Sequence, residues 1–139
     1  MPAIAAISER PLSLDAHVAA VSDAAHGAVA TFIGLVRDHD PAVEGTVTHL
    51  EYSCHPSARE VLEAIVADVE AQHGALVALT HRTGLLAVGE PAIVAAAGAS
   101  HRAEAFAACR EAVERVKAEL PIWKREILDS GAHTWVGIA

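Results

Sequence analysis

The stretch S-H-R-A-E-A-F-A-A-C-R-E-A-V-E-R-V-K-A-E-L-P, residues 100–121, carries the clearest structural signal in the sequence. Ser100 is suited to cap the start of a helix, and Pro121 ends it because proline cannot continue the backbone hydrogen bonding. The apolar positions between them recur at three- and four-residue steps and therefore share one helical face: Phe106, Cys109, Val113, Val116 and Leu120. The sequence predicts a long amphipathic helix here.

Segments that are typical of strands lie on both sides of this helix. Three apolar runs precede it, at residues 75–82, 85–88 and 92–99. After it, residues 122–128 and 134–138 indicate a hairpin that turns at Asp129-Ser130-Gly131. The helix therefore connects one set of strands to another.

The first half of the chain has the same character. Residues 4–8, 28–36 and 46–53 are expected to be strands. One helix is expected between the first two of these strands, and another after the third. Ser13 is a candidate cap for a helix that stops at Gly27. A capping box of Ser57 and Glu60 begins the other, which Pro56 precedes and Gly74 ends. The pattern predicts an α+β domain with three main helices and a mixed or largely antiparallel sheet.

Composition limits the classes of protein. The 139 residues are 53% hydrophobic and 20% charged, which predicts one globular domain over residues 1–139. A net charge of −8 argues against a nucleic-acid surface. Residues 1–7 show no basic region followed by a long apolar region, no stretch of the sequence has the apolar length typical of a membrane span, and Cys54 and Cys109 lack a Cys-x-x-Cys spacing. We therefore expect a cytoplasmic protein with reduced thiols.

The use of lysine is unusual. The chain has eight arginines but only Lys117 and Lys124, and both lie within the segment V-K-A-E-L-P-I-W-K-R-E. Lysine, unlike arginine, can lose its proton near neutral pH and so can act as an acid, base or nucleophile. Pro121 ends the helix of one lysine and begins the extended segment of the other, so the two amines can meet in one cleft. The alternative is that both are ordinary surface charges.

Two further segments are candidates for binding an anion. His101 and Arg102 follow Ser100 at the expected helix start, where free N–H groups attract negative charge, although an ordinary capped helix is the alternative. The loop Arg37-Asp38-His39-Asp40 follows an apolar strand. Its acidic and histidine residues are adjacent and no His-x-x-x-His pattern accompanies them, so we expect no metal site. Trp123 is expected in the core rather than stacked on a ligand.

Taken together, these segments resemble the large subunit of molybdopterin synthase, the MoaE family. The resemblance runs through most of the chain, and four blocks carry it: G-A-V-A-T-F-I-G-L-V-R-D-H at 27–39, H-R-T-G at 81–84, S-H-R-A-E-A-F at 100–106 and K-A-E-L-P-I-W-K-R-E at 117–126. It implies an α/β hammerhead fold and sulfur transfer to cyclic pyranopterin monophosphate without a metal or other cofactor. It also implies a small ubiquitin-like partner with a C-terminal Gly-Gly thiocarboxylate, at each end of a central dimer of this chain.

The resemblance also assigns roles to individual residues. Lys117 is implied as the acid, base or nucleophile, and Lys124 as a second catalytic residue that holds the tail carboxyl or the phosphate. The implied substrate pocket is completed by Leu35, Val36, Arg37, His101, Arg102, Arg125 and Glu126. Family members commonly continue with a basic segment, whereas this sequence ends at Ala139, so we expect the pocket to depend on the cations named.

Two other hypotheses remain. In the first, the chain is an inactive scaffold for a ubiquitin-like protein, but a scaffold would not need clustered cations. In the second, it is an unrelated phosphate-ester enzyme, but the sequence has no metal or P-loop signature.

Overall fold

The computed structural model describes residues 2–41 and 43–138, and in this part of the chain the segments expected to be regular form strands and helices. Along the chain these are β1 (Ile4–Ser8), α1 (Leu14–Ala20), β2 (Ala28–Leu35), β3 (Val47–Cys54), α2 (Ala58–His73), β4 (Leu76–Arg82), β5 (Gly84–Ala87), β6 (Pro91–Ala99), α3 (Arg102–Glu119), β7 (Ile122–Leu128) and β8 (His133–Ile138). The predicted α+β class with three main helices is confirmed.

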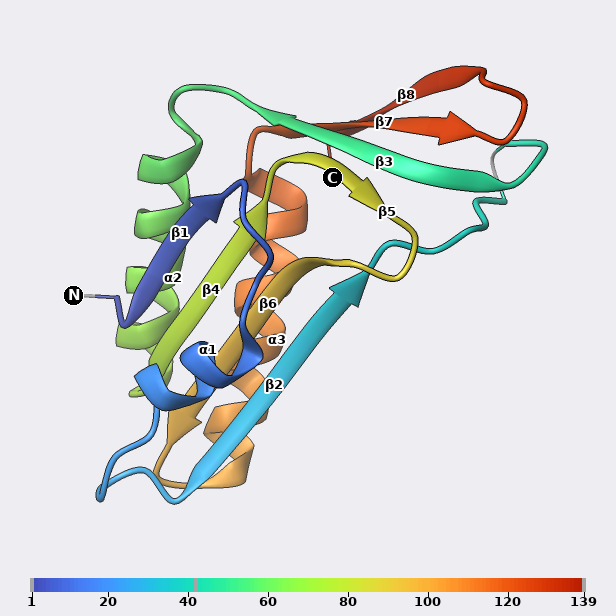
Figure 1. Ribbon diagram of the computed structural model, residues 1–139. Coiled ribbons are helices and arrows are strands. Elements are labelled where there is room, and N and C mark those ends of the chain that lie inside the picture. Colours follow the sequence, from blue (N-terminus) through green and yellow to red (C-terminus); the bar gives the residue numbers. More distant parts are fainter. Residues whose placement is uncertain (1, 42, 139) are drawn as a thin grey trace.

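The strands divide between two sheets rather than forming one (Figure 1). The first has the order β1-β4-β6-β2, in which β1 and β4 are parallel and the other pairs antiparallel. The second has the order β5-β3-β7-β8 and is antiparallel throughout. Strand β2 is thus an edge of the first sheet, with β6 as its single neighbour in the described chain.

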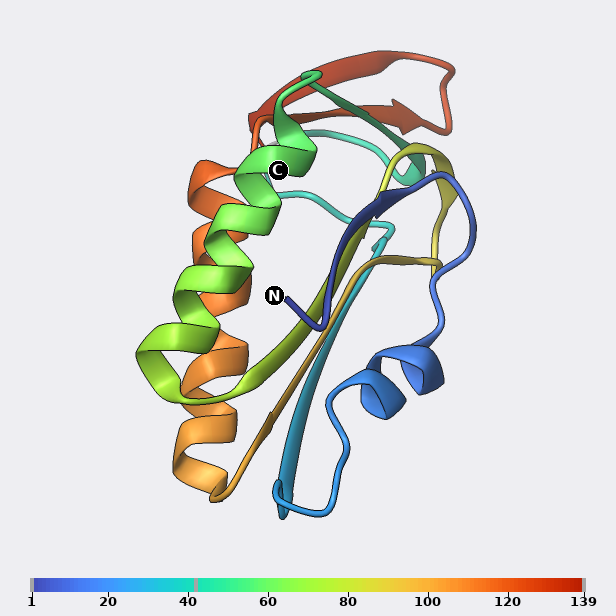
Figure 2. The same ribbon diagram turned by 90° about the vertical axis from the view of Figure 1, so that its left-hand side faces the viewer.

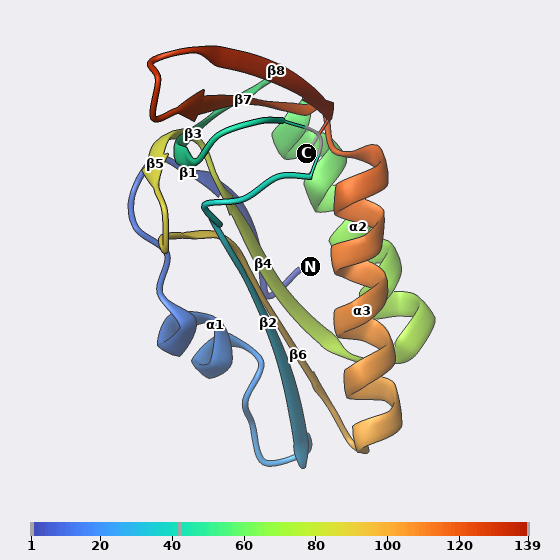
Figure 3. The same ribbon diagram turned by 90° about the vertical axis from the view of Figure 1, so that its right-hand side faces the viewer.

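The first sheet lies between helices. Helices α2 and α3 cover one face and the short α1 covers the other, as the views from either side show (Figures 2 and 3). The second sheet lies across the end of this layered unit, beside the C-terminal end of α3 (Figure 1). His17 fixes α1 to the sheet, with Nε2 lying 2.7 Å from the Thr80 hydroxyl oxygen.

Alanine dominates the contact between α3 and the sheet. On β6, Ala95, Ala97 and Ala99 are completely buried on the side of the long helices, and α3 presents residues of the same size, namely Ala105, Ala108 and Ala112. Because only methyl groups separate the two backbones, the helix lies close to the strand. The position of everything that α3 carries therefore depends on this layer.

Helix α1 is shorter than the sequence predicts. Ser13 caps it as expected, since its hydroxyl accepts a 3.1 Å hydrogen bond from the Ala16 N–H. The helix ends at Ala20, however, and does not reach Gly27. Asp23 accepts hydrogen bonds from the N–H groups of two following residues and forms a turn, so a short polar side chain competes with helix formation.

The other two predicted caps are wrong in detail. The Ser57 hydroxyl lies 2.8 Å from His55 Nδ1 and makes no cap hydrogen bond, although α2 ends at the left-handed Gly74 as predicted. The N-cap of α3 is His101, one residue after Ser100, again without a side-chain cap. Phe106 is 66% exposed, so it does not belong to the buried face of α3. That face begins at Ala105 instead.

Candidate active site

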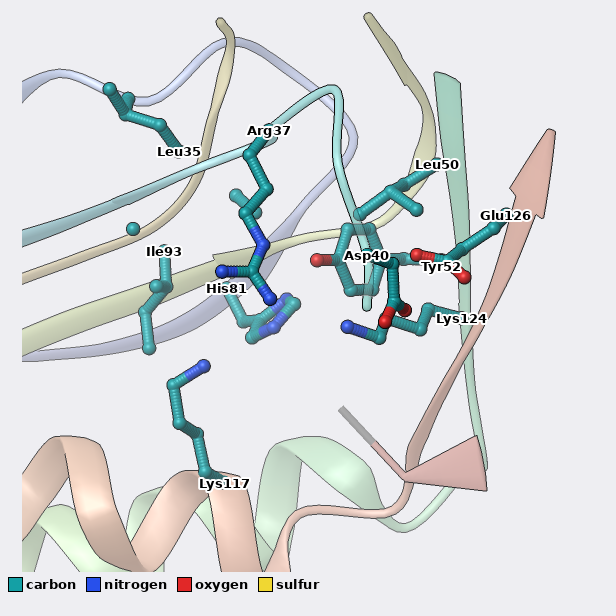
Figure 4. A pocket seen from close by; sticks show the side chains of 12 residues that line it. Leu35, Arg37, Asp40, Leu50, Tyr52, His81, Ile93, Lys117, Lys124 and Glu126 are labelled. Carbon is teal, nitrogen blue, oxygen red and sulfur yellow. The ribbon is translucent and has the colours of Figure 1, made fainter. Parts of the chain in front are cut away.

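A cavity of about 360 Å³ opens where the two sheets meet the C-terminal end of α3 (Figure 4). Its volume lies in the range of small-molecule sites. The described residues that line it are Gly34, Leu35, Arg37, Asp40, Leu50, Tyr52, His81, Ala92, Ile93, Lys117, Lys124 and Glu126. Both lysines of the chain and one arginine therefore face one hollow.

The turn at Pro121 brings the two lysines together. Lys117 stands in the last turn of α3, and the chain then becomes extended at Leu120, the C-cap residue. The Pro121 carbonyl accepts a 3.0 Å hydrogen bond from the His55 N–H, which fixes the point at which the chain enters β7. Lys124 follows on that strand and lines the opposite wall (Figure 4).

Arg37 reaches the cavity from the loop after β2. The preceding residue anchors this loop: the Val36 N–H donates to the Glu90 carbonyl at 3.0 Å, and the Gly89 N–H donates to the Val36 carbonyl at 2.7 Å. Val36 itself is only 2% exposed and is not among the described residues of the cavity. Its backbone groups are already used, so the expected contribution of Val36 to substrate binding is not supported, whereas Leu35 does line the cavity.

The alternation of β7 separates its charged residues. Lys124 and Glu126 both face the cavity, while Arg125 between them points to the other side of the sheet. There its guanidinium lies 2.8 Å from the Glu51 carboxylate and 5.8 Å from the centre of the Trp135 ring. Arg125 therefore lies outside the cavity. Trp123, expected in the core, is 36% exposed.

His101 and Arg102 lie at the far end of α3. Arg102 and Lys117 are fifteen positions apart along α3, which corresponds to about 22 Å along the axis. Both residues are exposed and neither lines the cavity of the same chain. The expected pocket is thus incomplete within one chain, because helix length alone keeps these two cations away from it.

The cavity concentrates positive charge. Within the described part of the chain, Arg37, Lys117 and Lys124 form no ion pair, whereas Arg82, Arg115 and Arg125 each do. Side-chain nitrogens of the three free cations point into the space around His81 (Figure 4). An anion that enters would meet three cations that are not held in ion pairs by the described residues, although Asp40 and Glu126 also line the cavity.

Glu126 is the acidic group embedded among these cations. It is 4% exposed, and burial, followed by a hydrogen bond and charge repulsion from Asp40, raises its pKa above the ordinary value. Lys124 and Arg37 act in the opposite direction. Burial and then the nearby Glu126 raise the pKa of Tyr52 to about 12, so this phenol stays protonated at neutral pH.

Three polar residues of the cavity were not among the site residues predicted from the sequence. Tyr52 and His81 lie on otherwise apolar strands, and their rings meet edge to face with centres 5.0 Å apart. His81 belongs to the H-R-T-G block, which was the one available signal for it. Asp40 was considered only as part of a possible metal site, and no cluster of three metal-binding side chains occurs in the described residues.

Comparison with known proteins agrees with this geometry. The family model described as "MoaE protein" matches residues 7–119. The chain belongs to the MoaE family. A molybdopterin synthase catalytic subunit from Mycobacterium tuberculosis is 42% identical over 133 residues, which cover 94% of this chain and 88% of that protein. No helix in the described part of this MoaE-family chain is long and apolar enough to cross a membrane.

Solved structures agree with the family assignment. Molybdopterin synthase from Staphylococcus aureus superposes with a TM-score of 0.87 at 29% identity, covering 99% of this chain and 98% of that one. A complex of subunits 1 and 2 of the molybdopterin-converting factor from Helicobacter pylori has a TM-score of 0.67 at 18% identity, covering 81% of this chain and 73% of that one. The second likeness shows the MoaE fold alone.

Proposed function

We propose that this chain transfers sulfur from the C-terminal thiocarboxylate of a small ubiquitin-like subunit to cyclic pyranopterin monophosphate, forming the dithiolene of molybdopterin. The observation that carries the proposal is the cavity with Arg37, Lys117 and Lys124, three cations that form no ion pair with any residue the structure describes. A thiocarboxylate and a cyclic phosphate are both anions, so the same cations attract both reactants.

The cavity suits the chemistry of the transfer. On the pterin, each new carbon–sulfur bond replaces a carbon–oxygen bond, whose oxygen leaves either on the ring-opened phosphate or as water. On the tail, the carbon–sulfur bond breaks, and water supplies the oxygen that leaves the tail as a carboxylate. Negative charge develops on oxygen and sulfur in these steps, and fixed cations stabilise it without rearranging. We assign acid–base or nucleophilic chemistry to Lys117 and the positioning of the tail or phosphate to Lys124 and Arg37.

A second copy of the chain would complete the pocket. Strand β2 has a free edge, and its Ala28 end pairs with Ala99, just before α3 begins, while its Leu35 end lies at the cavity. Two β2 edges that pair antiparallel about a two-fold axis would place the partner's α3 start beside this cavity. His101 and Arg102 would then act on the site of the other copy.

Apolar side chains along this edge support the pairing. Val29, Phe32 and Ile33 are 37–40% exposed although they belong to a strand, and Phe106 on α3 is 66% exposed. Phe32 and Phe106 line a second hollow of about 310 Å³, which is mostly apolar in character. Exposed apolar surface beside an unpaired edge is typical of an interface between chains.

The small subunit is assigned as the sulfur donor and obligatory partner. Curated relatives are named catalytic subunits of molybdopterin synthase, and the Helicobacter pylori structure is described as a complex of two subunits. A flexible C-terminal tail can enter a cavity of this size, where the three cations would meet its terminal anion. No sulfur-bearing group of this chain is needed, since Cys109 is buried and neither cysteine lines the cavity.

The deciding experiment mixes this protein with thiocarboxylated small subunit and cyclic pyranopterin monophosphate and measures molybdopterin formed. We expect product with wild type, at least a hundredfold slower formation with Lys117→Ala, roughly the loss seen when one key acid–base group is removed, and little change with Arg59→Ala, an exposed residue of α2 away from both hollows, as the matched surface control. Absence of product with wild type would favour the scaffold hypothesis. Undiminished product with Lys117→Ala would remove Lys117 from the chemistry.

A further inference from the structure

His81 is the buried titratable group that the proposed chemistry leaves without a role. It lies near the end of β4, is 5% exposed, and lines the cavity beside Tyr52. Buried histidines usually have a hydrogen-bond partner on each ring nitrogen. In His81 the described residues provide a partner for Nδ1, the Arg82 carbonyl, and none for Nε2. The question is what its second nitrogen does.

The protonation of His81 follows from its surroundings. Nδ1 lies 2.8 Å from the Arg82 carbonyl oxygen, and a carbonyl only accepts, so Nδ1 carries the hydrogen. Burial is the main cause that lowers the pKa of His81, to about 4. The hydrogen bond to the Arg82 carbonyl raises this pKa, and the positive charge of Lys117 lowers it. The ring is therefore neutral at pH 7, and Nε2, for which the described residues provide no hydrogen-bond partner, keeps a lone pair in the wall of the cavity.

Lys117 is the charged residue of the cavity that acts electrostatically on His81. It is the charged side chain whose positive field contributes to the lowered pKa of His81. Figure 4 shows its ammonium rising from α3 toward the space between His81 and Arg37. The lysine stem is long and flexible, and the Lys117 residue is exposed, so its amine needs an acceptor to hold one orientation.

We propose that His81 is a positioning residue, whose neutral Nε2 accepts a hydrogen bond from the Lys117 ammonium and aims this amine at the bound anion. The contact is open in this structure and requires rotation of the Lys117 side chain, and such contacts often tighten only when substrate binds. His81 does not serve as the base, because an imidazole that protonates only near pH 4 is too weak to take a lysine proton. This assignment rests on the proposed function for its catalytic consequence, but its geometry can be tested alone.

Two substitutions separate the nitrogens of His81. In His81→Asn the amide nitrogen falls near Nδ1 and keeps the donor for the Arg82 carbonyl, but nothing remains at Nε2. In His81→Gln the amide oxygen reaches the place of Nε2 and restores an acceptor. The pair therefore tests the lone pair rather than the bulk of the ring.

The two-lysine composition makes a direct readout possible. Protein labelled with ¹³C and ¹⁵N in lysine gives two side-chain ε-methylene signals, and Lys124→Arg assigns them. We expect the Lys117 signal of His81→Asn to move toward the position seen in unfolded protein, that of His81→Gln to stay near wild type, and the Lys124 signal to stay fixed. An unchanged Lys117 signal in folded His81→Asn would overturn the proposal.

A reciprocal measurement covers the case in which His81 variants fail to fold. In ¹⁵N-histidine-labelled protein, Lys117→Met is expected to shift the Nε2 resonance of His81, whereas Lys124→Met leaves it in place. Equal effects of the two variants, or none from Lys117→Met, would contradict the contact.

Activity provides the last arm. With the thiocarboxylated partner and cyclic pyranopterin monophosphate, we expect His81→Asn to lower kcat about tenfold or more with a smaller change in KM, and His81→Gln to recover most of the rate. Equal rates in both variants would sink the positioning role. If wild type makes no product, the proposed function fails while the resonance measurements still decide whether His81 holds Lys117.

Discussion

Nη1 of Arg82 lies 2.6 Å from Oε2 of Glu90, and this ion pair joins the end of β4 to the turn that holds the Arg37 loop. The backbone of Glu90 accepts the Val36 N–H, so the side chain and main chain of one residue connect the H-R-T-G block to the loop. His81 and Arg37 are thereby fixed relative to each other through their sequence neighbours. The block thus has a physical role that its letters alone do not reveal.

Glu90→Ala should loosen this connection. The Arg82 side chain is 12% exposed and would lose its carboxylate partner, so we expect the free energy of unfolding to fall by about 1 to 2 kcal/mol. Hydrogen exchange at the Val36 N–H should also accelerate. Denaturant unfolding and exchange mass spectrometry measure the two effects. Glu119→Ala, which breaks an exposed ion pair with Arg115, is the control and should cost less. Equal losses would refute the special role of Glu90.

Mixing two inactive variants tests whether neighbouring copies share a site. If Arg102 serves the cavity of the other copy, Lys117→Ala mixed with Arg102→Ala gives mixed dimers that each contain one intact cavity. Random exchange of equal amounts should then restore about a quarter of the wild-type rate of molybdopterin formation. The same mixture with Phe106→Glu introduced into both chains should recover less, because a charge enters the proposed interface. No recovery after verified subunit exchange would mean that Arg102 does not act on the cavity of the other copy.

The raised pKa of Glu126 predicts that anion binding strengthens in mild acid. As pH falls, this carboxylate takes a proton at a higher pH than an ordinary glutamate, and the cavity becomes more positive. Sulfate keeps its charge over this range and is a suitable probe by calorimetry. We expect sulfate binding to tighten as pH falls, with an onset at higher pH than an ordinary glutamate would give, and Glu126→Gln should bind tightly throughout. Glu51→Gln, on the opposite face of the second sheet, should behave like wild type. A pH effect that survives Glu126→Gln in full would argue against this origin.

His81 should make the fold sensitive to acid. Its pKa is about 4 in the folded chain and near 6.5 when exposed, so the unfolded state binds the extra proton first as pH falls. The stability contributed by the neutral ring is present above pH 6.5 and is lost progressively toward pH 4. Relative to His81→Gln, wild type should lose about 2 kcal/mol by pH 5 and about 3 kcal/mol by pH 4. Parallel stability curves for the two proteins would exclude His81 as the cause.

Gly98 is required by close packing rather than by backbone conformation. A methyl group at this position of β6 would overlap the carbonyl oxygen of Val21 at the end of α1. Gly98→Ala should therefore lower the free energy of unfolding by about 2 kcal/mol or more. Gly27→Ala is the matched control, since its methyl would meet the Ser100 carbonyl at an ordinary 3.6 Å. Thermal unfolding of both variants measures the difference, and similar melting temperatures would contradict the argument.

Local periodicity made most of the elements predictable, but not how the strands divide. The stripe of α2 and the hairpin of β7 and β8 depend on neighbouring residues, and both were anticipated. The pairing of β3 with β7 joins segments far apart in sequence, and no local pattern encodes it. Helix α1 was overestimated because Asp23 forms a turn within an otherwise helical spacing.

The candidate site was predictable only where charge marked it. Lys117, Lys124 and Arg37 were found because cations are few and stand out in an acidic chain. His81 is masked by the apolar strand that carries it, so its exposure to the cavity depends on the packing of two sheets. The separation of Arg102 from Lys117 was available from the expected helix length but has meaning only once the cavity is placed.

The alanine layer between β6 and α3 sets the distance of Lys117 from the other cations of the cavity, although no alanine takes part in the chemistry. Replacing Ala108 by valine would thicken the layer and move α3 away from the sheet, together with Lys117 in its last turn. The amine would then fall short of an anion held by Arg37 and Lys124, even in a protein that still folds. Selection for catalysis in this chain therefore extends to side chains whose only property is being small.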